Sequence, residues 1–229
     1  MTEPTGMTEP TRVTESTGMI ESTGAASRVA DALREQIAAG RLAPGSRLSE
    51  DAVRRAYGVS RSTLREAFRL LIRERLLVHQ LSRGVFVRQL GRADVSDLYQ
   101  VRRVIECAAL RSITTLSLDG LRRLAAAIKD GNEAAERSDW DAVAVASIRF
   151  HEALVALAGS ARLDDVISGV LAEFRLAYAH MKDTQIFHSA FLKRNGEIAD
   201  TLRAGDIDGA ADMLNRYLLD AEEVLLSNF

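Results

Sequence analysis

The sequence contains few cysteines, prolines and aromatic residues, and these shortages limit the folds and sites that it can form. The single cysteine, Cys107, excludes an internal disulfide framework and a Cys-rich zinc site. The sequence has only three prolines and 5% aromatic residues. Its hydrophobic residues, 47% of the chain, are mostly Ala, Leu and Val, and this composition favours helices. No apolar run approaches the roughly 18 residues of a membrane span, and the N-terminus lacks a basic stretch followed by an apolar one. We therefore expect a cytoplasmic protein of one or two domains without a membrane partner.

The net charge of −2 hides an uneven distribution along the 229 residues. Residues 1–24 carry −3, residues 25–90 carry +7 and residues 91–229 carry −6. The basic segment contains thirteen arginines and no lysine. This asymmetry indicates an anionic partner for residues 25–90.

The first 24 residues are an imperfect hexad repeat, MTEPTG, MTEPTR, VTESTG, MIESTG. They carry Thr, Glu, Gly and Pro and offer almost nothing to bury. We expect a disordered tail, with ordered structure beginning near Ala25.

Caps and turn residues divide residues 25–90 into three helices and a β-hairpin. Ser27, Ser49 and Ser60 are suited to cap helices, and Gly40 and Gly58 to end them. The helices are expected at 27–39, 50–57 and 61–75, with a turn at Pro44-Gly45 between the first two. Residues 76–87 read as two short strands around a turn at Ser82-Arg83-Gly84. This order is that of a winged helix-turn-helix domain.

The third helix carries the residues best suited to DNA. Arg61 and Arg65 are four residues apart and share a face, so a helix entering the major groove would bring both to base edges. Arginine bidentate to guanine is the commonest specific contact. The alternative is a solvated face with Glu66 and Glu74 as ion partners. The candidate DNA-binding residues are Ser60, Arg61, Ser62, Thr63 and Arg65 on the helix, and Arg83 and Gly84 at the hairpin tip.

These residues resemble the GntR family of bacterial transcription regulators. The matching motifs are Pro44-Gly45, Leu48-Ser49-Glu50, Gly58-Val59-Ser60-Arg61, Arg65-Glu66-Ala67 and Arg83-Gly84-Val85-Phe86-Val87. The resemblance implies sequence-specific binding to a double-stranded DNA operator, with Arg61 and Arg65 reading bases. Asp51 departs from the pattern, because some relatives place a DNA-contacting arginine there.

Residues 91–229 read as helical throughout. Breaks near 117–120, 138–139, 159–160 and 205–206 separate most of the helical patterns, and we expect an antiparallel bundle of about six helices. On the first of these helices the spacing predicts a buried stripe of Leu98, Val101, Ile105 and Ala108. Cys107 lies one residue off this stripe, and we expect a buried, inert thiol there.

This second segment is similar to the FCD-type effector domain of the FadR branch of that family. The similarity rests on residues 98–106, Phe150-His151, residues 202–206 and the Ala-rich last helix. It implies an all-helical domain that dimerises and holds a small-molecule pocket.

Many relatives hold a divalent metal in that pocket with one Asp and three His. In the family register these positions are Ser147, His151, Asn195 and Arg216, so one ligand in four is retained. A transition metal needs three or four N, O or S ligands in fixed geometry. We therefore expect no metal and no other cofactor.

The residues that stand at the family's metal-ligand positions suggest instead a pocket for an anionic metabolite. Arg216 and Arg102 would supply the positive charge, and a guanidinium fork suits a carboxylate or phosphate. Ser147, His151 and Asn195 would add neutral hydrogen bonds. The alternative is that Arg216 points to solvent or pairs with an acid, and that His151 is a satisfied core histidine.

We expect a transcription regulator, a repressor that binds a pseudo-palindromic operator as a homodimer and responds to a small organic acid or other anion. The alternative is a ligand-independent regulator whose degenerate pocket only supports dimerisation. An enzyme with His151 as base is disfavoured, because the sequence shows neither paired carboxylates near His151 nor a nucleophile motif.

Overall fold

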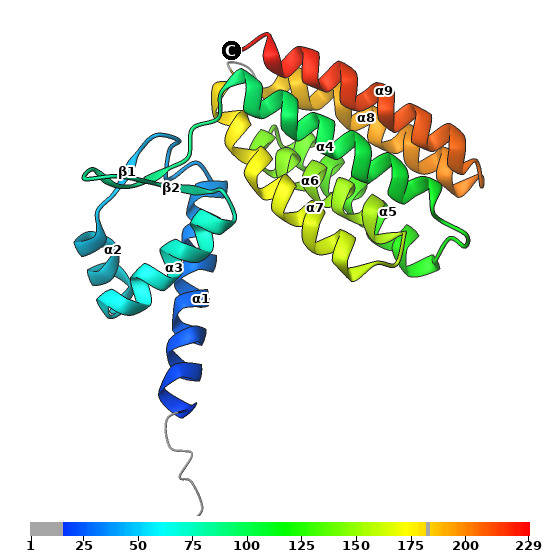
Figure 1. Ribbon diagram of the computed structural model, residues 1–229. Helices are drawn as coiled ribbons and strands as arrows, with labels where there is room; N and C mark the ends of the chain where they lie inside the picture. The colour runs from blue at the N-terminus through cyan, green and yellow to red at the C-terminus, as the bar shows by residue number, and fades with distance from the viewer. Residues whose placement is uncertain (1–15, 182–183) are drawn as a thin grey trace, which may run out of the picture.

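The computed structural model describes residues 16–181 and 184–229, and it is mainly helical (Figure 1). The helices are α1 (Ser16–Ala38), α2 (Glu50–Tyr57), α3 (Arg61–Arg73), α4 (Arg92–Arg111), α5 (Leu118–Glu136), α6 (Trp140–Ala156), α7 (Ala161–Phe174), the 3₁₀ helix η1 (Arg175–His180), α8 (Thr184–Arg203) and α9 (Ile207–Leu226). The strands are β1 (Arg47–Leu48), β2 (Leu77–Gln80) and β3 (Gly84–Val87). Within the described ranges no helix is long and apolar enough to cross a membrane.

The N-terminal part is the predicted winged helix-turn-helix. Helix α1 packs along α3, and the two helices bury Leu33, Leu64 and Phe68 between them and the sheet. The expected strands β2 and β3 pair antiparallel, with Leu77 opposite Val87 and Gln80 opposite Gly84.

A third strand completes the sheet and was not predicted. Strand β1 pairs antiparallel with β3, which gives the strand order β1-β3-β2. It places Arg47 opposite Phe86 and buries Leu48. Two residues are too few for an alternating pattern, so the sequence carries no signal for this strand.

Helix α1 begins earlier than predicted. It starts at Ser16, within the segment expected to be a disordered tail, and Ser27 lies inside the helix rather than at its cap. The buried turns around Ala26, Val29 and Ala30 hold the helix in place. Once a helix is nucleated, each further residue adds a hydrogen bond at little extra cost, so the chain before Ala26 continues it. Residues 1–15 of the predicted tail lie outside the described residues.

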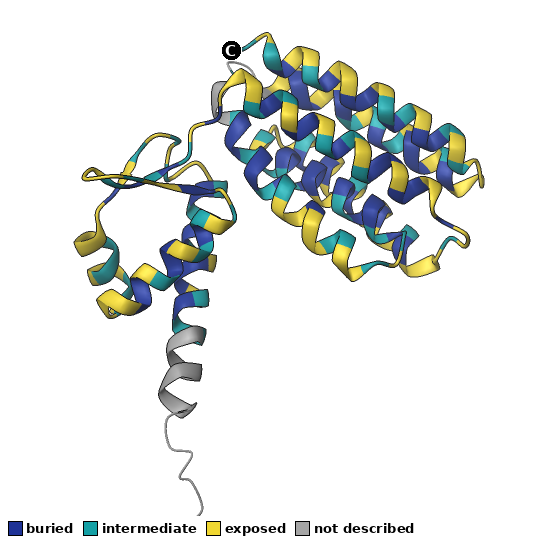
Figure 2. Cartoon of the chain, viewed as in Figure 1, coloured by how far each residue is buried: buried dark blue, intermediate teal, exposed yellow. Residues whose placement is uncertain are grey.

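The C-terminal part is the predicted bundle of six α-helices, α4 to α9. The most extensive packing joins α5 to α6 and α4 to α9 (Figure 1). Buried residues fill the centre of the bundle and exposed ones cover its outer faces (Figure 2).

The buried face of α4 differs from the predicted stripe. Ala108 is exposed, whereas Arg102 and Glu106 are 2% and 0% exposed. The prediction counted only apolar residues, and this face of α4 carries a buried ion pair instead. Cys107 is buried as expected, and burial raises the pKa of its thiol to about 11.

Candidate DNA-binding surface and bundle interior

The turn between α2 and α3 is set by local chemistry. Ser49 caps α2, since its hydroxyl accepts from the amide of Ala52 over 3.3 Å. Gly58 ends the helix at φ 63°, a left-handed conformation that glycine adopts without strain. This turn and the hairpin tip lie on the side of the domain that faces away from the bundle (Figure 1).

The first turn of α3 is held by a cluster of hydroxyl groups. The Ser60 hydroxyl accepts from the amide of Thr63 over 3.1 Å and lies 2.8 Å from the hydroxyls of Ser62 and Thr63. Ser60 and Ser62 are exposed, as a role at a phosphate requires. Thr63, the third candidate of this turn, is only 7% exposed, and its hydroxyl bonds to Ser60 rather than facing solvent. Its position four residues before Ala67, on the buried side of the helix, explains this.

The two arginines of the motif are exposed, and no described carboxylate pairs with them. Within the described part of the chain, neither Arg61 nor Arg65 lies within ion-pair distance of a carboxylate. Glu66 pairs instead with Arg69 over 3.1 Å, and Glu74 binds Arg34. The alternative in which these acids neutralise Arg61 and Arg65 is therefore not what the structure shows.

The hairpin tip adds further positive charge. Arg83 is exposed and its guanidinium lies 5.8 Å from the centre of the Phe86 ring. Gly84 has φ 101°, and a Cβ placed there would come within 3.5 Å of the Arg47 guanidinium. Arg47 therefore lies against the tip, which sequence reasoning missed because β1 was not foreseen.

Inside the bundle, polar side chains from three helices form one hydrogen-bonded network. The Nε of Arg102 donates to Oε1 of Glu106 over 2.8 Å, and Nδ1 of His151 lies 2.6 Å from Oε2 of the same carboxylate. On the other side of the ring, Nε2 of His151 lies 3.4 Å from the Tyr217 hydroxyl, which also hydrogen-bonds to Ser147. The Arg102 guanidinium stacks 4.6 Å from the centre of the Phe174 ring.

The network fixes the charges of its members. Burial alone would raise the pKa of Glu106, but the charge of Arg102 and the hydrogen bonds from His151 and Arg102 lower it, so the carboxylate is ionised. Burial lowers the pKa of His151 despite the neighbouring carboxylate, so the imidazole is neutral and donates from Nδ1. Burial raises the pKa of Tyr217 to about 12. One cation and one anion therefore compensate each other inside the bundle.

Two family models together match most of the chain. Residues 25–87 match the model of bacterial regulatory proteins of the gntR family, and residues 97–220 match the FCD domain. The chain belongs to the GntR family. It combines the DNA-binding domain of these regulators with an FCD domain, as in the FadR-like subfamily, and it is a transcriptional regulator and not an enzyme.

Similar proteins share this organisation. The HTH-type transcriptional regulator BphR of Paraburkholderia xenovorans is 29% identical over 81% of this chain and 79% of its own length. The HTH-type transcriptional repressor RspR of Escherichia coli is 26% identical over 83% of this chain and 84% of its own length. A GntR transcriptional regulator from Rhodococcus sp. RHA1 of known crystal structure is 42% identical, covers 90% of this chain and 100% of its own, and superposes with a TM-score of 0.85.

The interior of this GntR-family regulator does not fit a transition metal. Ser147 and His151 lie on α6 and Asn195 on α8, two of the three helices that would hold the ligands, and they are 8%, 2% and 2% exposed. Only one of them is an imidazole, and the one nearby carboxylate, Glu106, is bound by Arg102 and His151. In the described ranges no three His, Cys, Asp or Glu side chains group so that they could hold a metal.

Arg216 does not take part in this interior cluster, contrary to the prediction. Arg216 is exposed, and its neighbour Tyr217 is the residue of α9 that faces inward. Adjacent helical residues point about 100° apart, so a register one residue off turns the side chain outward. The cluster therefore lacks the net positive charge expected from Arg102 and Arg216 together.

Glu106 and Tyr217 are the interior residues that sequence reasoning missed. The signal for Glu106 was its spacing of four residues from Arg102 on one helix face. Asn195 is also buried, and its Oδ1 has no hydrogen-bond partner among the described residues.

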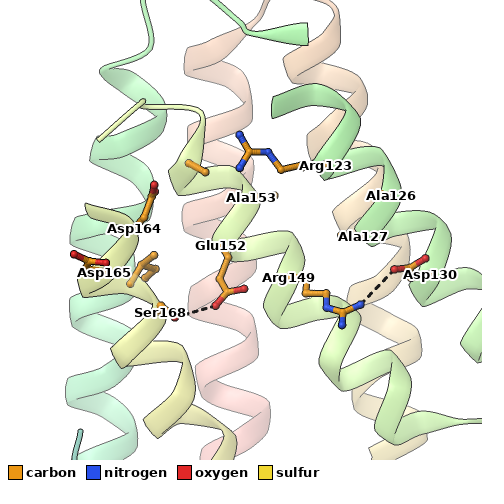
Figure 3. Close-up of a pocket in the computed structure, with 12 residues that line it drawn as sticks. Arg123, Ala126, Ala127, Asp130, Arg149, Glu152, Ala153, Asp164, Asp165 and Ser168 are labelled. Atoms are coloured by element: carbon orange, nitrogen blue, oxygen red, sulfur yellow. Dashed lines mark hydrogen bonds and ion pairs between the residues drawn. The ribbon is translucent and has the colours of Figure 1, made fainter. Parts of the chain in front are cut away.

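A separate groove of about 520 Å³ lies on the outside of the bundle, between α5, α6 and α7 (Figure 3). Glu152 accepts a hydrogen bond from Ser168 over 3.3 Å on one side, and Arg149 pairs with Asp130 over 3.5 Å on the other. None of the residues predicted for DNA or effector binding lines this groove.

Proposed function

We propose that this regulator binds a pseudo-palindromic operator as a homodimer, represses transcription there, and changes its DNA affinity when a small anionic metabolite binds. The observation that carries DNA binding is that Arg61 and Arg65 are exposed at the start of α3 and pair with no carboxylate of the described residues. The similarity to RspR, named a repressor, supports repression. We expect the protein to act in the cytoplasm, where the operator lies.

The proposed contacts divide into base reading and backbone anchoring. Arg61 and Arg65 read base edges in the major groove, where a bidentate guanidinium pairs with guanine. Ser60 and Ser62, at the positive end of the α3 dipole, bind a phosphate. Arg83 anchors the hairpin tip on the neighbouring backbone, with Gly84 allowing a close approach.

The outer face of α4 and α7 supports the homodimer. Val104 on α4 and Val166 on α7 are 65% and 50% exposed, and the half-buried Ile105 and Val170 pack on the core beneath them. Helices α4 and α7 pack against each other, and we name their outer surface, which carries these side chains, the α4–α7 face. A second copy is the occupant proposed for it, because a two-fold symmetric operator requires two DNA-binding domains related by the same symmetry.

The charges inside the bundle compensate each other, which bears on where an anionic effector can bind. Glu106 neutralises Arg102, so the cluster of Arg102, Ser147, His151 and Asn195 offers an anion no net charge, although Asn195 retains an unsatisfied oxygen. The alternative, a ligand-independent regulator, follows if the buried network only stabilises the bundle. An effector-dependent regulator changes its affinity for DNA when a metabolite binds, and a ligand-independent regulator does not.

A gel shift with DNA from the region upstream of its own gene tests the function. We expect a retarded complex that survives excess nonspecific DNA, with a stoichiometry of two chains per site. Binding that nonspecific DNA competes away equally would refute an operator-specific regulator.

A further inference from the structure

The two domains meet at the end of α1, and Arg175 spans this contact. Arg175 opens η1, directly after α7, and its Nη2 donates to the carbonyl oxygen of Ala38 over 2.5 Å. Ala38 is the last residue of α1, where carbonyl groups lack helical partners and the negative end of the helix dipole lies. A guanidinium from the bundle therefore caps the helix that supports the recognition helix.

In the part of the chain that the structure describes, the charge of Arg175 has no counter-ion within ion-pair distance. Over the described ranges, no carboxylate lies within 4.0 Å of its guanidinium, and Asp141 and Glu152 act on it only from farther away. Arg175 is half-buried, and burial lowers its pKa. Burying a cation without an anion is unfavourable, so the site favours an anion from outside.

A cavity of about 210 Å³ lies beside this guanidinium, between the two domains. Ile37 at the end of α1, Ala144 of α6 and Leu176 of η1 give it apolar walls, while Arg175 and His188 are polar groups in its lining. At ~30 Å³ per water, the space equals about seven water molecules and suits a small metabolite. Apolar walls with a few convergent polar groups are the usual composition of a ligand site.

His188 supplies the second polar group. Its side chain is 3% exposed, and its Nε2 is buried with no hydrogen-bond partner among the residues that the structure describes. Burial lowers its pKa to about 4, so the imidazole is neutral at physiological pH. Buried polar atoms are nearly always hydrogen-bonded, and a hydroxyl group complements either tautomer because it both donates and accepts.

We propose that this junction cavity is the effector site, and that it binds a small oxyanion carrying a hydroxyl group, with the oxyanion on Arg175 and the hydroxyl on Nε2 of His188. The inference rests on the proposed function, because it locates the effector that function requires. Asp141 also lines the cavity but is exposed, and its negative charge makes the site favour a singly charged carboxylate over a dicarboxylate.

The position of the cavity gives the ligand a direct effect on DNA binding. An oxyanion on Arg175 competes with the Ala38 carbonyl and releases the end of α1 from the bundle. Helix α1 is tied to the end of α3 by Arg34, which binds both oxygens of Glu74 over 2.9 and 2.8 Å. The DNA-binding domain therefore moves with α1, and the spacing of the two recognition helices in a dimer changes. A ligand with different affinities for the two arrangements shifts their populations.

Isothermal titration calorimetry on the full chain tests the site, with 3-hydroxybutyrate and glycerol 3-phosphate as probes at constant ionic strength. We expect one of them to bind, which distinguishes a carboxylate from a phosphate. Arg175→Gln should weaken that binding by on the order of tenfold or more, since it removes a charge-assisted hydrogen bond. Ala144→Leu fills the cavity while leaving Arg175 in place, and should abolish binding. The matched control is Arg216→Gln, an exposed arginine of α9, which should bind as the wild type does.

Circular dichroism confirms that each variant is folded before its binding is compared. Equal binding of the probe by the wild type, Arg175→Gln and Ala144→Leu would place the ligand elsewhere and overturn the inference. A failure of both probes to bind the wild type would overturn it as well. The DNA-binding assay without ligand reports separately on the proposed function. If no operator complex forms while the probe binds and both variants weaken it, the site stands and the proposed function falls.

Discussion

Nδ1 of His151 lies 2.6 Å from Oε2 of Glu106 inside a helical bundle, and the other oxygen of that carboxylate accepts from Arg102. This arrangement places an ionised acid between a neutral imidazole and a guanidinium, all at 3% side-chain exposure or less. In the family register His151 is a metal ligand, and here its ring nitrogens face Glu106 and Tyr217. The network holds α4, α6 and α9 together through hydrogen bonds.

Breaking the ion pair on one side should destabilise the protein strongly. Glu106→Gln leaves the Arg102 guanidinium buried without an anion, which costs about 3–5 kcal/mol. The double variant Arg102→Leu/Glu106→Leu removes both charges and should recover most of that loss. Urea denaturation measures both, and Glu133→Gln, in an exposed pair with Lys129, is the control that should change little. A Glu106→Gln protein as stable as the wild type would show that the pair is not structural.

Acid should destabilise the fold through His188. Burial lowers its folded pKa to about 4 from an ordinary value near 6.5, so its contribution to stability is present above pH 6.5 and is lost as the pH falls towards 4. The sign follows because the unfolded chain binds the proton that the folded chain excludes. The free energy of unfolding should fall by about 2 kcal/mol from pH 7 to pH 5 on this account. His188→Gln should lose that part of the pH dependence in urea denaturation, and an unchanged slope would contradict the prediction.

The sequence predicts those features that depend on neighbouring residues. Gly58 and Ser60 define the turn before α3 because a left-handed glycine and a serine cap act within one turn of chain. The exposed faces of Arg61 and Arg65 follow from the same helix period. These elements need no information from distant parts of the chain.

The features that depend on distant partners were not predicted. Strand β1 exists only because β3 pairs with it, and the contact of Arg175 with Ala38 joins residues 137 positions apart. Tyr217 was missed because the family register pointed to Arg216, whereas packing against His151 decides which residue faces inward. Apolar periodicity likewise overlooked Glu106, because a buried charge is stable only beside its partner.

Replacing the base-reading arginine should reduce specific DNA binding. Arg61→Ala should cost about 1–3 kcal/mol of affinity for the operator and relax specificity at one base pair, since it removes a bidentate contact. Arg83→Ala should instead weaken binding to all sequences alike and reduce the slope of affinity against salt by about one. Fluorescence anisotropy at several salt concentrations separates the two, with Arg137→Ala in the bundle as the control. Wild-type operator affinity in Arg61→Ala would show that α3 is not the recognition helix.

A charge on the α4–α7 face should dissociate the dimer. Val104 is 65% exposed in the single chain, and burying it against a second copy would remove its apolar surface from water. Val104→Glu would place a carboxylate in that interface without a partner, so analytical ultracentrifugation should show monomers where the wild type sediments as a dimer. Leu118→Glu is a matched control, because Leu118 is 72% exposed on α5, outside this face. If Leu118→Glu dissociates the protein and Val104→Glu does not, the interface lies elsewhere on the bundle. Operator affinity should also fall in the Val104→Glu protein, because a monomer has one DNA-binding domain and contacts only one half-site.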